Sequence, residues 1–133
     1  MKPVFADTFY FLALLNERDA AHPRAVTASR AAGLVLVTTE FVLLEIADAL
    51  CKPDQREEVL ALWSVVQNDP AFRLIAATSE LIERARRLYR ECPDKEWPLT
   101  DCISFVVMQE ERLSEALTGD HHFVQAGFRA LLA

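Results

Sequence analysis

Four acidic residues are the side chains of this sequence best suited to chemistry. They lie far apart in the chain, at Asp7, Glu45, Asp101 and Asp120. If they meet in a partly dry cleft, their mutual repulsion is costly unless a divalent cation neutralises them. Carboxylate oxygens are ligands that Mg²⁺ prefers, and a cation held in this way suits reactions of phosphate groups. The acids therefore predict a metal site, provided that the fold brings them together.

The elements that must position these acids are predicted by apolar runs and the breakers between them. We predict strands over Val4–Ala6, Leu34–Val37, Phe72–Ala76, Glu115–Leu117 and Phe128–Leu132. We predict helices over Thr8–Leu15, His22–Ala32, the stretch after Thr38 or Thr39 through Leu50, Gln55–Gln67, Ser79–Glu91, Asp101–Glu111 and His122–Ala126. This alternation predicts an α/β fold with three α/β/α layers, whose central, mostly parallel sheet has four to five strands.

Sheets of this kind bind ligands outside the carboxyl ends of their strands, where the strand order reverses. Asp7 and Asp120 follow predicted strands and so lie at such ends. Glu45 and Asp101 lie on predicted helices, and each reaches the same crevice if its helix crosses the top of the sheet. The predicted topology thus offers a way for the four acids to converge.

Each acid also has an alternative explanation without a ligand. An Asp at a helix start accepts backbone N–H bonds, which stabilises the helix by about 0.5–2 kcal/mol. Asp7, Asp101 and Asp120 could all be such caps. Glu45 is harder to explain, because it lies between apolar residues in mid-helix, where a carboxylate facing the core needs a partner. Asp48 lies one turn later, so an exposed polar stripe remains an alternative for Glu45.

Composition limits the class of protein. The 133 residues suit one domain over positions 1–133, and 52% hydrophobic content with three glycines favours a compact, helix-rich fold. No apolar stretch approaches the roughly 20 residues of a membrane span, and no signal peptide is evident. Three cysteines without metal-like spacing suit reduced thiols, so we expect a cytoplasmic protein without membrane contact. The net charge of −6 counts against nucleic acid as a partner, unless several acids surround a cation.

The four acids in order also resemble a known family. The resemblance rests on Val4-Phe5-Ala6-Asp7-Thr8, on Glu45 in an aliphatic helix, on Leu99-Thr100-Asp101, and on Thr118-Gly119-Asp120-His121-His122-Phe123. Each motif alone is weak, whereas the ordered set covers nearly the whole chain. This pattern resembles the PIN-domain ribonucleases, and among them the VapC-type toxins of prokaryotic toxin–antitoxin pairs.

The resemblance implies an endoribonuclease that depends on Mg²⁺ or Mn²⁺. Its acidic pocket is expected at the four acids, with the metal held by Asp7, Asp101 and Asp120, and with neighbouring hydroxyl groups at Thr8, Ser104 and Thr118. A helical Ser bonding to its own backbone is the commoner explanation for Ser104. The resemblance further implies an RNA substrate, a homodimer and a small antitoxin protein. It leaves open the RNA target, the number of metal ions and the carboxylate that acts as base.

One position departs from the family pattern. Many relatives carry a further acid two residues after the fourth, and this chain has His122 there. His122 could bind Mn²⁺ or a phosphate, but paired histidines without a third ligand at suitable spacing are more often surface residues. The expected site therefore excludes His121 and His122.

RNA approaching an acidic protein needs basic residues around the pocket. Arg84, Arg86, Arg87 and Arg90 cluster on one predicted helix, and Arg18 and Arg24 lie near the first loop. A solvated helix face is the favoured explanation for the cluster. Unpaired bases could stack on aromatic residues such as Trp97 or Tyr10, unless both belong to the core.

Two other functions compete with the nuclease. A receiver-like or phosphatase-like domain needs paired acids near the first strand and a late Lys, and the only lysines here are Lys2, Lys52 and Lys95. A non-catalytic interaction module would use the acids only as helix caps. Binding of Mn²⁺ separates this module from a nuclease.

Overall fold

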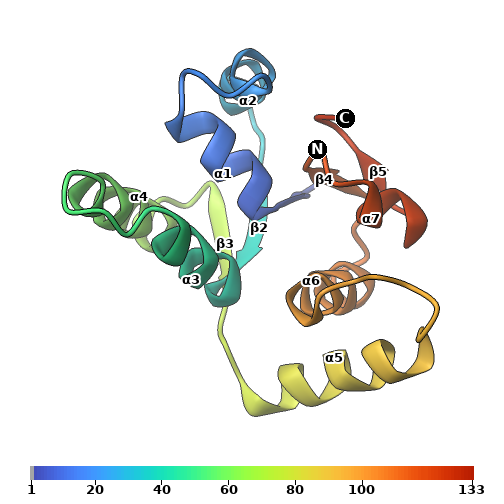
Figure 1. Ribbon diagram of the computed structural model, residues 1–133. Coiled ribbons are helices and arrows are strands. Elements are labelled where there is room, and N and C mark those ends of the chain that lie inside the picture. Colours follow the sequence, from blue (N-terminus) through green and yellow to red (C-terminus); the bar gives the residue numbers. More distant parts are fainter. Residues whose placement is uncertain (1) are drawn as a thin grey trace.

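The computed structural model describes residues 2–133, in which helices alternate with short strands (Figure 1). The strands are β1 (Val4–Ala6), β2 (Leu36–Thr39), β3 (Phe72–Ile75), β4 (Glu115–Leu117) and β5 (Arg129–Ala130). The helices are α1 (Thr8–Leu15), α2 (His22–Ser29), α3 (Glu40–Ala49), α4 (Arg56–Asn68), α5 (Ser79–Glu91), α6 (Leu99–Glu110) and α7 (His121–Gln125). Every predicted strand and helix is present.

The five strands form one sheet in the order β3-β2-β1-β4-β5. All neighbouring pairs are parallel. The α/β prediction is confirmed, and the sheet is parallel throughout. The chain moves outward from β1 to β3 and then returns to the other side of β1, so the strand order reverses between β1 and β4. Residues that follow these two strands lie side by side at the carboxyl edge, which is the usual ligand position in such sheets.

The core fills both sides of this sheet. β1 and β2 are buried along their whole length, as expected for central parallel strands. Phe105 of α6 packs edge-on against Phe123 of α7 and against Trp97, with ring centroids 5.0 Å apart in each pair. Figure 1 shows two groups of helices, α1–α4 and α5–α6, with the sheet between them. Within residues 2–133, no helix has both the length and the apolar character needed to cross a membrane.

Several boundaries differ from the predicted ones. α2 ends at Ser29, and Gly33 lies in the following turn with φ of 71°, so this glycine serves the turn instead of closing the helix. β2 runs from Leu36 to Thr39 because it pairs with β3 over four residues. Thr39 then caps α3 through a bond from the backbone nitrogen of Val42. α6 begins at Leu99, directly after Pro98, which places Asp101 inside the first turn.

Candidate functional site

Asp7 lies at the carboxyl end of β1, directly before α1. It occupies the N-cap position of α1, yet its side chain makes no capping hydrogen bond. Its Oδ2 accepts a 2.8 Å hydrogen bond from the hydroxyl group of Thr118, which follows the neighbouring strand β4. Asp7 is only 7% exposed. The capping explanation therefore fails for this residue, and a buried carboxylate faces the gap between β1 and β4.

Asp120 lies on the other side of that gap, in the turn between β4 and α7. Its Oδ1 accepts a bond from the backbone nitrogen of His122 and so caps α7. Its own backbone nitrogen donates to the hydroxyl oxygen of Thr118 over 3.1 Å. Thr118 is fully buried and holds both acids, because its hydroxyl group donates to Asp7 and accepts from Asp120. Asp120 is thus a cap and a member of the cluster at once.

Glu45 reaches the cluster from the middle of α3. Its Oε1 accepts a 2.9 Å bond from the hydroxyl group of Thr8, the residue after Asp7. Its Oε2 lies 3.4 Å from the hydroxyl group of Thr100, the residue before Asp101. Two hydroxyl groups from different helices therefore fix this carboxylate between α1 and α6. Glu45 therefore has the polar partners that we expected for a carboxylate among apolar residues. The contact with Thr100 was not predicted.

Asp101 meets a residue that was excluded from the expected site. Its Oδ2 lies 3.0 Å from Nδ1 of His122, and this nitrogen also lies 3.3 Å from Oδ1 of Asp120. His122 thus bridges the two acids. The position of His122, two residues after Asp120, was the only sign in the sequence that it could belong to the site. The direction of its ring depends on how α6 packs against α7, which the sequence does not show.

Burial and mutual repulsion shift the ionisation of two of these acids. Burial raises the pKa of Asp7 to about 7, with a smaller upward contribution from the charges of Asp101 and Glu45, while the Thr118 bond opposes the shift. Burial likewise raises the pKa of Asp101 to about 6; the His122 bond opposes this, and repulsion from Asp120 and Glu45 adds to it. Two carboxylates therefore carry charge at a cost in free energy.

This arrangement fits a divalent cation. Among residues 2–133, no Lys or Arg side chain forms an ion pair with any of the four acids. The polar side chains that contact these carboxylates are the two imidazole rings of His121 and His122 and the hydroxyl groups of Thr8, Thr100 and Thr118. The available donors are mainly carboxylate oxygens, which match the preference of Mg²⁺ and Mn²⁺.

The other predicted contacts are less well supported. The hydroxyl group of Ser104 lies 3.3 Å from the backbone oxygen of Thr100, which is the local bond expected of a helical Ser. Trp97 and Tyr10 are 8% and 2% exposed and belong to the core, so the stacking role suggested for them is wrong. Arg84 pairs with Glu110 and Arg86 with Glu83, whereas Arg24 donates to the backbone oxygen of Leu132.

Comparison with known proteins identifies the family and supports the fold. The model of the PIN domain family matches residues 4–129. The chain is 27% identical over 125 residues to the 23S rRNA-specific endonuclease VapC20 of Mycobacterium tuberculosis, covering 94% of this chain and 95% of that protein. The crystal structure of VapC20, described as a Sarcin-Ricin loop cleaving toxin, superposes with a TM-score of 0.84 over the same shares. VapBC2 from Rickettsia felis, solved with a DNA fragment, shares the fold at 11% identity, with a TM-score of 0.69 and 97% of each chain covered.

Proposed function

Because the chain belongs to the PIN domain family, we propose that it is a divalent-metal-dependent endoribonuclease. The observation that supports this most strongly is the meeting of four remote acids at the carboxyl edge of the sheet, with no Lys or Arg paired to them in the part of the chain described. The proposed catalytic residues are Asp7, Glu45, Asp101 and Asp120. VapC20 supports the choice of RNA as substrate, since it is similar to this chain over nearly its whole length.

The residues of the cluster have different proposed roles. Asp7, Asp101 and Asp120 would hold Mg²⁺ or Mn²⁺ with their carboxylate oxygens. Such a cation, when bound, supplies activation of water and stabilisation of the charge that develops on the phosphate. Thr118 orients Asp7 and fixes the backbone of Asp120. No side chain has to act as nucleophile.

Glu45 has a different role from the three ligands. Thr8 and Thr100 hold its two oxygens, so its direction is set before substrate arrives. We assign Glu45 to orienting water in the cleft or accepting its proton. A group prepared in this way costs little reorganisation during the reaction.

The proposed partners come from the resemblance of the sequence to VapC-type toxins, and VapC20 is itself described as a toxin. We propose that the protein is a cytoplasmic toxin, neutralised by a cognate antitoxin and assembled as a homodimer. Leu44 on α3 and Leu60 and Val65 on α4 are exposed by about half or more, which provides apolar surface for such contacts. Light scattering of the purified protein at several concentrations tests the homodimer.

The nuclease is tested with the purified full chain and 23S rRNA, the substrate named for VapC20. We expect cleavage with Mg²⁺ or Mn²⁺ that stops on addition of EDTA. Asp7→Asn and Asp101→Asn should each lower the rate at least about 100-fold with the fold intact. Asp48→Asn is the matched control, because Asp48 is an exposed acid one turn from Glu45. Full activity of Asp7→Asn would refute the mechanism.

Expression in bacteria gives a second test. We expect growth arrest from the unchanged protein and normal growth from Asp7→Asn at the same protein level. Arrest that persists with Asp7→Asn would mean that toxicity does not come from this cleft.

A further inference from the structure

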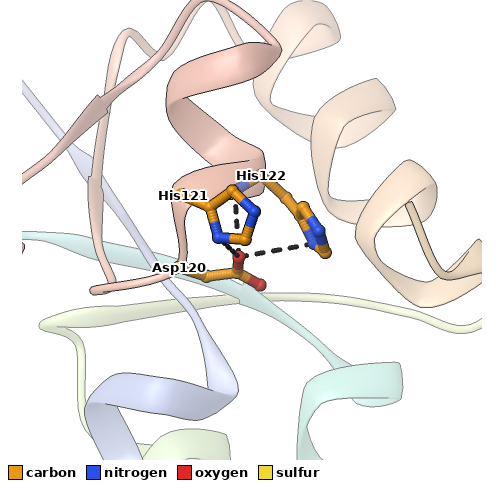
Figure 2. A group of neighbouring side chains, drawn as sticks. All are labelled: Asp120, His121 and His122. Atoms are coloured by element: carbon orange, nitrogen blue, oxygen red, sulfur yellow. Dashed lines mark hydrogen bonds and ion pairs between the residues drawn. The ribbon is translucent and has the colours of Figure 1, made fainter. Parts of the chain in front are cut away.

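Two imidazole rings converge on one carboxylate at the edge of the acidic cluster. Asp120, His121 and His122 each present a ligand atom, and these atoms lie within 4.8 Å of one another. Nδ1 of His122 is 3.3 Å from Oδ1 of Asp120, and Nδ1 of His121 is 3.7 Å from the same oxygen. Figure 2 shows both rings beside that carboxylate, and their centroids are 4.4 Å apart. Two nitrogen donors and an oxygen donor therefore surround a common point.

A second carboxylate approaches His122 from a different helix. Oδ2 of Asp101, on α6, is 3.0 Å from Nδ1 of His122. Asp101 and His122 have side chains only 14% and 17% exposed, whereas the His121 side chain is 76% exposed. The group is thus enclosed on one side and open at His121, which gives an ion a way in. This contact between α6 and α7 is independent of the local geometry of the Asp-His-His sequence.

The donor set differs from what Mg²⁺ prefers. Mg²⁺ takes oxygen ligands in an octahedron, whereas imidazole nitrogen favours borderline transition metals. Zn²⁺ binds nitrogen and oxygen at about 2.0–2.2 Å in a tetrahedron, whose ligand atoms are then about 3.3–3.6 Å apart. The separations of 3.3 and 3.7 Å between Oδ1 of Asp120 and the two imidazole nitrogens lie around this range. A cation that replaced the proton between Asp101 and His122 would leave both residues in place.

We propose that Asp120, His121 and His122, together with the adjacent Asp101, form a binding site for a borderline transition metal such as Zn²⁺. The site shares Asp101 and Asp120 with the proposed catalytic cleft and excludes Asp7. Zn²⁺ bound here occupies two carboxylates that the nuclease needs, and it therefore inhibits cleavage in Mg²⁺. The inhibition rests on the proposed nuclease function, whereas the binding site itself does not.

The binding site is tested by titrating the full chain with Co²⁺, which substitutes for Zn²⁺ and has visible absorption bands that report tetrahedral coordination. Cys51 is exposed and could bind Co²⁺ itself, so all proteins carry Cys51→Ser. We expect tetrahedral bands that Zn²⁺ abolishes. His121→Ala and His122→Ala should each weaken Zn²⁺ binding about tenfold or more.

Two variants serve as controls for binding. Asp7→Asn should keep its Zn²⁺ affinity, because Asp7 is not in the donor set. His22→Gln should also keep it, since Nδ1 of His22 contacts the backbone oxygen of Ala13 instead. The proposal fails if no tetrahedral bands form, or if neither His121→Ala nor His122→Ala weakens Zn²⁺ binding. His121 is exposed, so His121→Ala tests the site even if His122→Ala does not fold.

The inhibition is tested by cleavage of RNA in Mg²⁺ with increasing Zn²⁺. We expect inhibition of the unchanged protein, and cleavage by His121→Ala that needs about tenfold more Zn²⁺ to stop. Equal sensitivity of the two proteins would overturn the regulatory claim. If the unchanged protein binds Zn²⁺ as expected but does not cut RNA in Mg²⁺, the nuclease is refuted and the metal site stands.

Discussion

The charged form of Asp7 destabilises the folded protein, because the side chain is buried. Its pKa is raised from 3.8 to about 7, so between about pH 4 and pH 7 the folded protein binds more protons than the unfolded chain. The free energy of unfolding therefore falls as pH rises through this window. A bound cation would remove the cost by neutralising the charge. The free energy of unfolding without divalent cations should thus show how much the charged Asp7 destabilises the protein when no cation neutralises it.

Asp7→Asn should stabilise the protein while it abolishes activity. Without divalent cations we expect the free energy of unfolding to rise by about 2 kcal/mol at pH 8, and by much less at pH 4, where Asp7 of the folded protein is protonated and no charge is buried. Urea unfolding at both pH values, in EDTA, measures the difference. Equal stability of the two proteins at pH 8 would contradict the burial of a charged Asp7.

Thr118 should matter for metal binding without touching the metal. Thr118→Val keeps the shape of the side chain but removes the hydroxyl group that donates to Asp7 and accepts from Asp120. Losing the Thr118 bond raises the pKa of Asp7 further. We expect Mn²⁺ affinity near pH 7 to fall about tenfold, measured by calorimetry. Thr27→Val, at an exposed position on α2, is the control and should bind Mn²⁺ normally.

At the level of single residues, the sequence predicted which acids meet better than it predicted the residues that contact them. Asp7 and Asp120 follow strands that a parallel sheet must bring to one edge, so their meeting could be expected from topology. The His122 ring and Thr100 could not be assigned in this way, because their directions depend on the angles at which helices meet. Glu45 lies between these cases: its apolar surroundings demanded a partner, but the sequence did not say which.

Among the elements, the turn from β4 to α7 is held closely against α1. Gly119 lies in this turn between Thr118 and Asp120, and a Cβ atom built on it would overlap the ring of Phe9 on α1. The glycine is needed here for space. Anything larger must push the turn away from α1 or displace the Phe9 ring.

Gly119→Ala should therefore disturb the site through its supporting elements. We expect a loss of about 1–3 kcal/mol in unfolding free energy from overpacking, with weaker Mn²⁺ binding. Phe9→Leu in the same chain should restore part of the Mn²⁺ affinity, because it removes the ring that the new methyl group meets. Gly127→Ala is the comparison: Gly127 has open space around it but φ of 95°, so its effect should come from backbone strain and should not be rescued by Phe9→Leu.

The type and order of the elements could be read from the sequence, but some of their ends could not. Apolar runs and breakers were sufficient for every strand and helix. Strand ends depend on pairing between strands. Thr38 and Thr39 belong to β2 because four residues of β2 pair with β3. β5 is shorter than the edge strand that we predicted. The pairing that sets the ends of β2 and β5 cannot be read from the residues of those strands alone.

For the whole molecule, the proposed RNA substrate must approach a protein with a net charge of −6. Arg90 lies at the end of α5 and lines an open cavity of about 880 Å³ that extends to Leu99, two residues before Asp101. Arg84, earlier on α5, pairs with Glu110 at the far end of α6, so the two helices run antiparallel and Arg90 lies near the start of α6. Arg90 and Lys95 thus place two basic side chains on a cavity that leads to the start of α6.

Arg90→Glu should weaken RNA binding and leave metal binding intact. We expect weaker RNA binding and a salt dependence reduced by about one phosphate contact, measured by fluorescence anisotropy with Asp7→Asn protein to prevent cleavage. Arg30→Glu makes the same charge change at an exposed site after α2 and should bind RNA more tightly than Arg90→Glu. Similar losses in both proteins would show that only net charge matters.

The position of β4 beside β1 has a consequence for synthesis of the protein. Asp7 leaves the ribosome well before Thr118, whose hydroxyl group holds it, because the two residues are 111 positions apart. A nascent chain, or a fragment from a truncated message, that stops before β4 has neither this neighbour nor Asp120. Such products should therefore lack the proposed nuclease activity, because the site is complete only after β4 and the turn that follows it have been made.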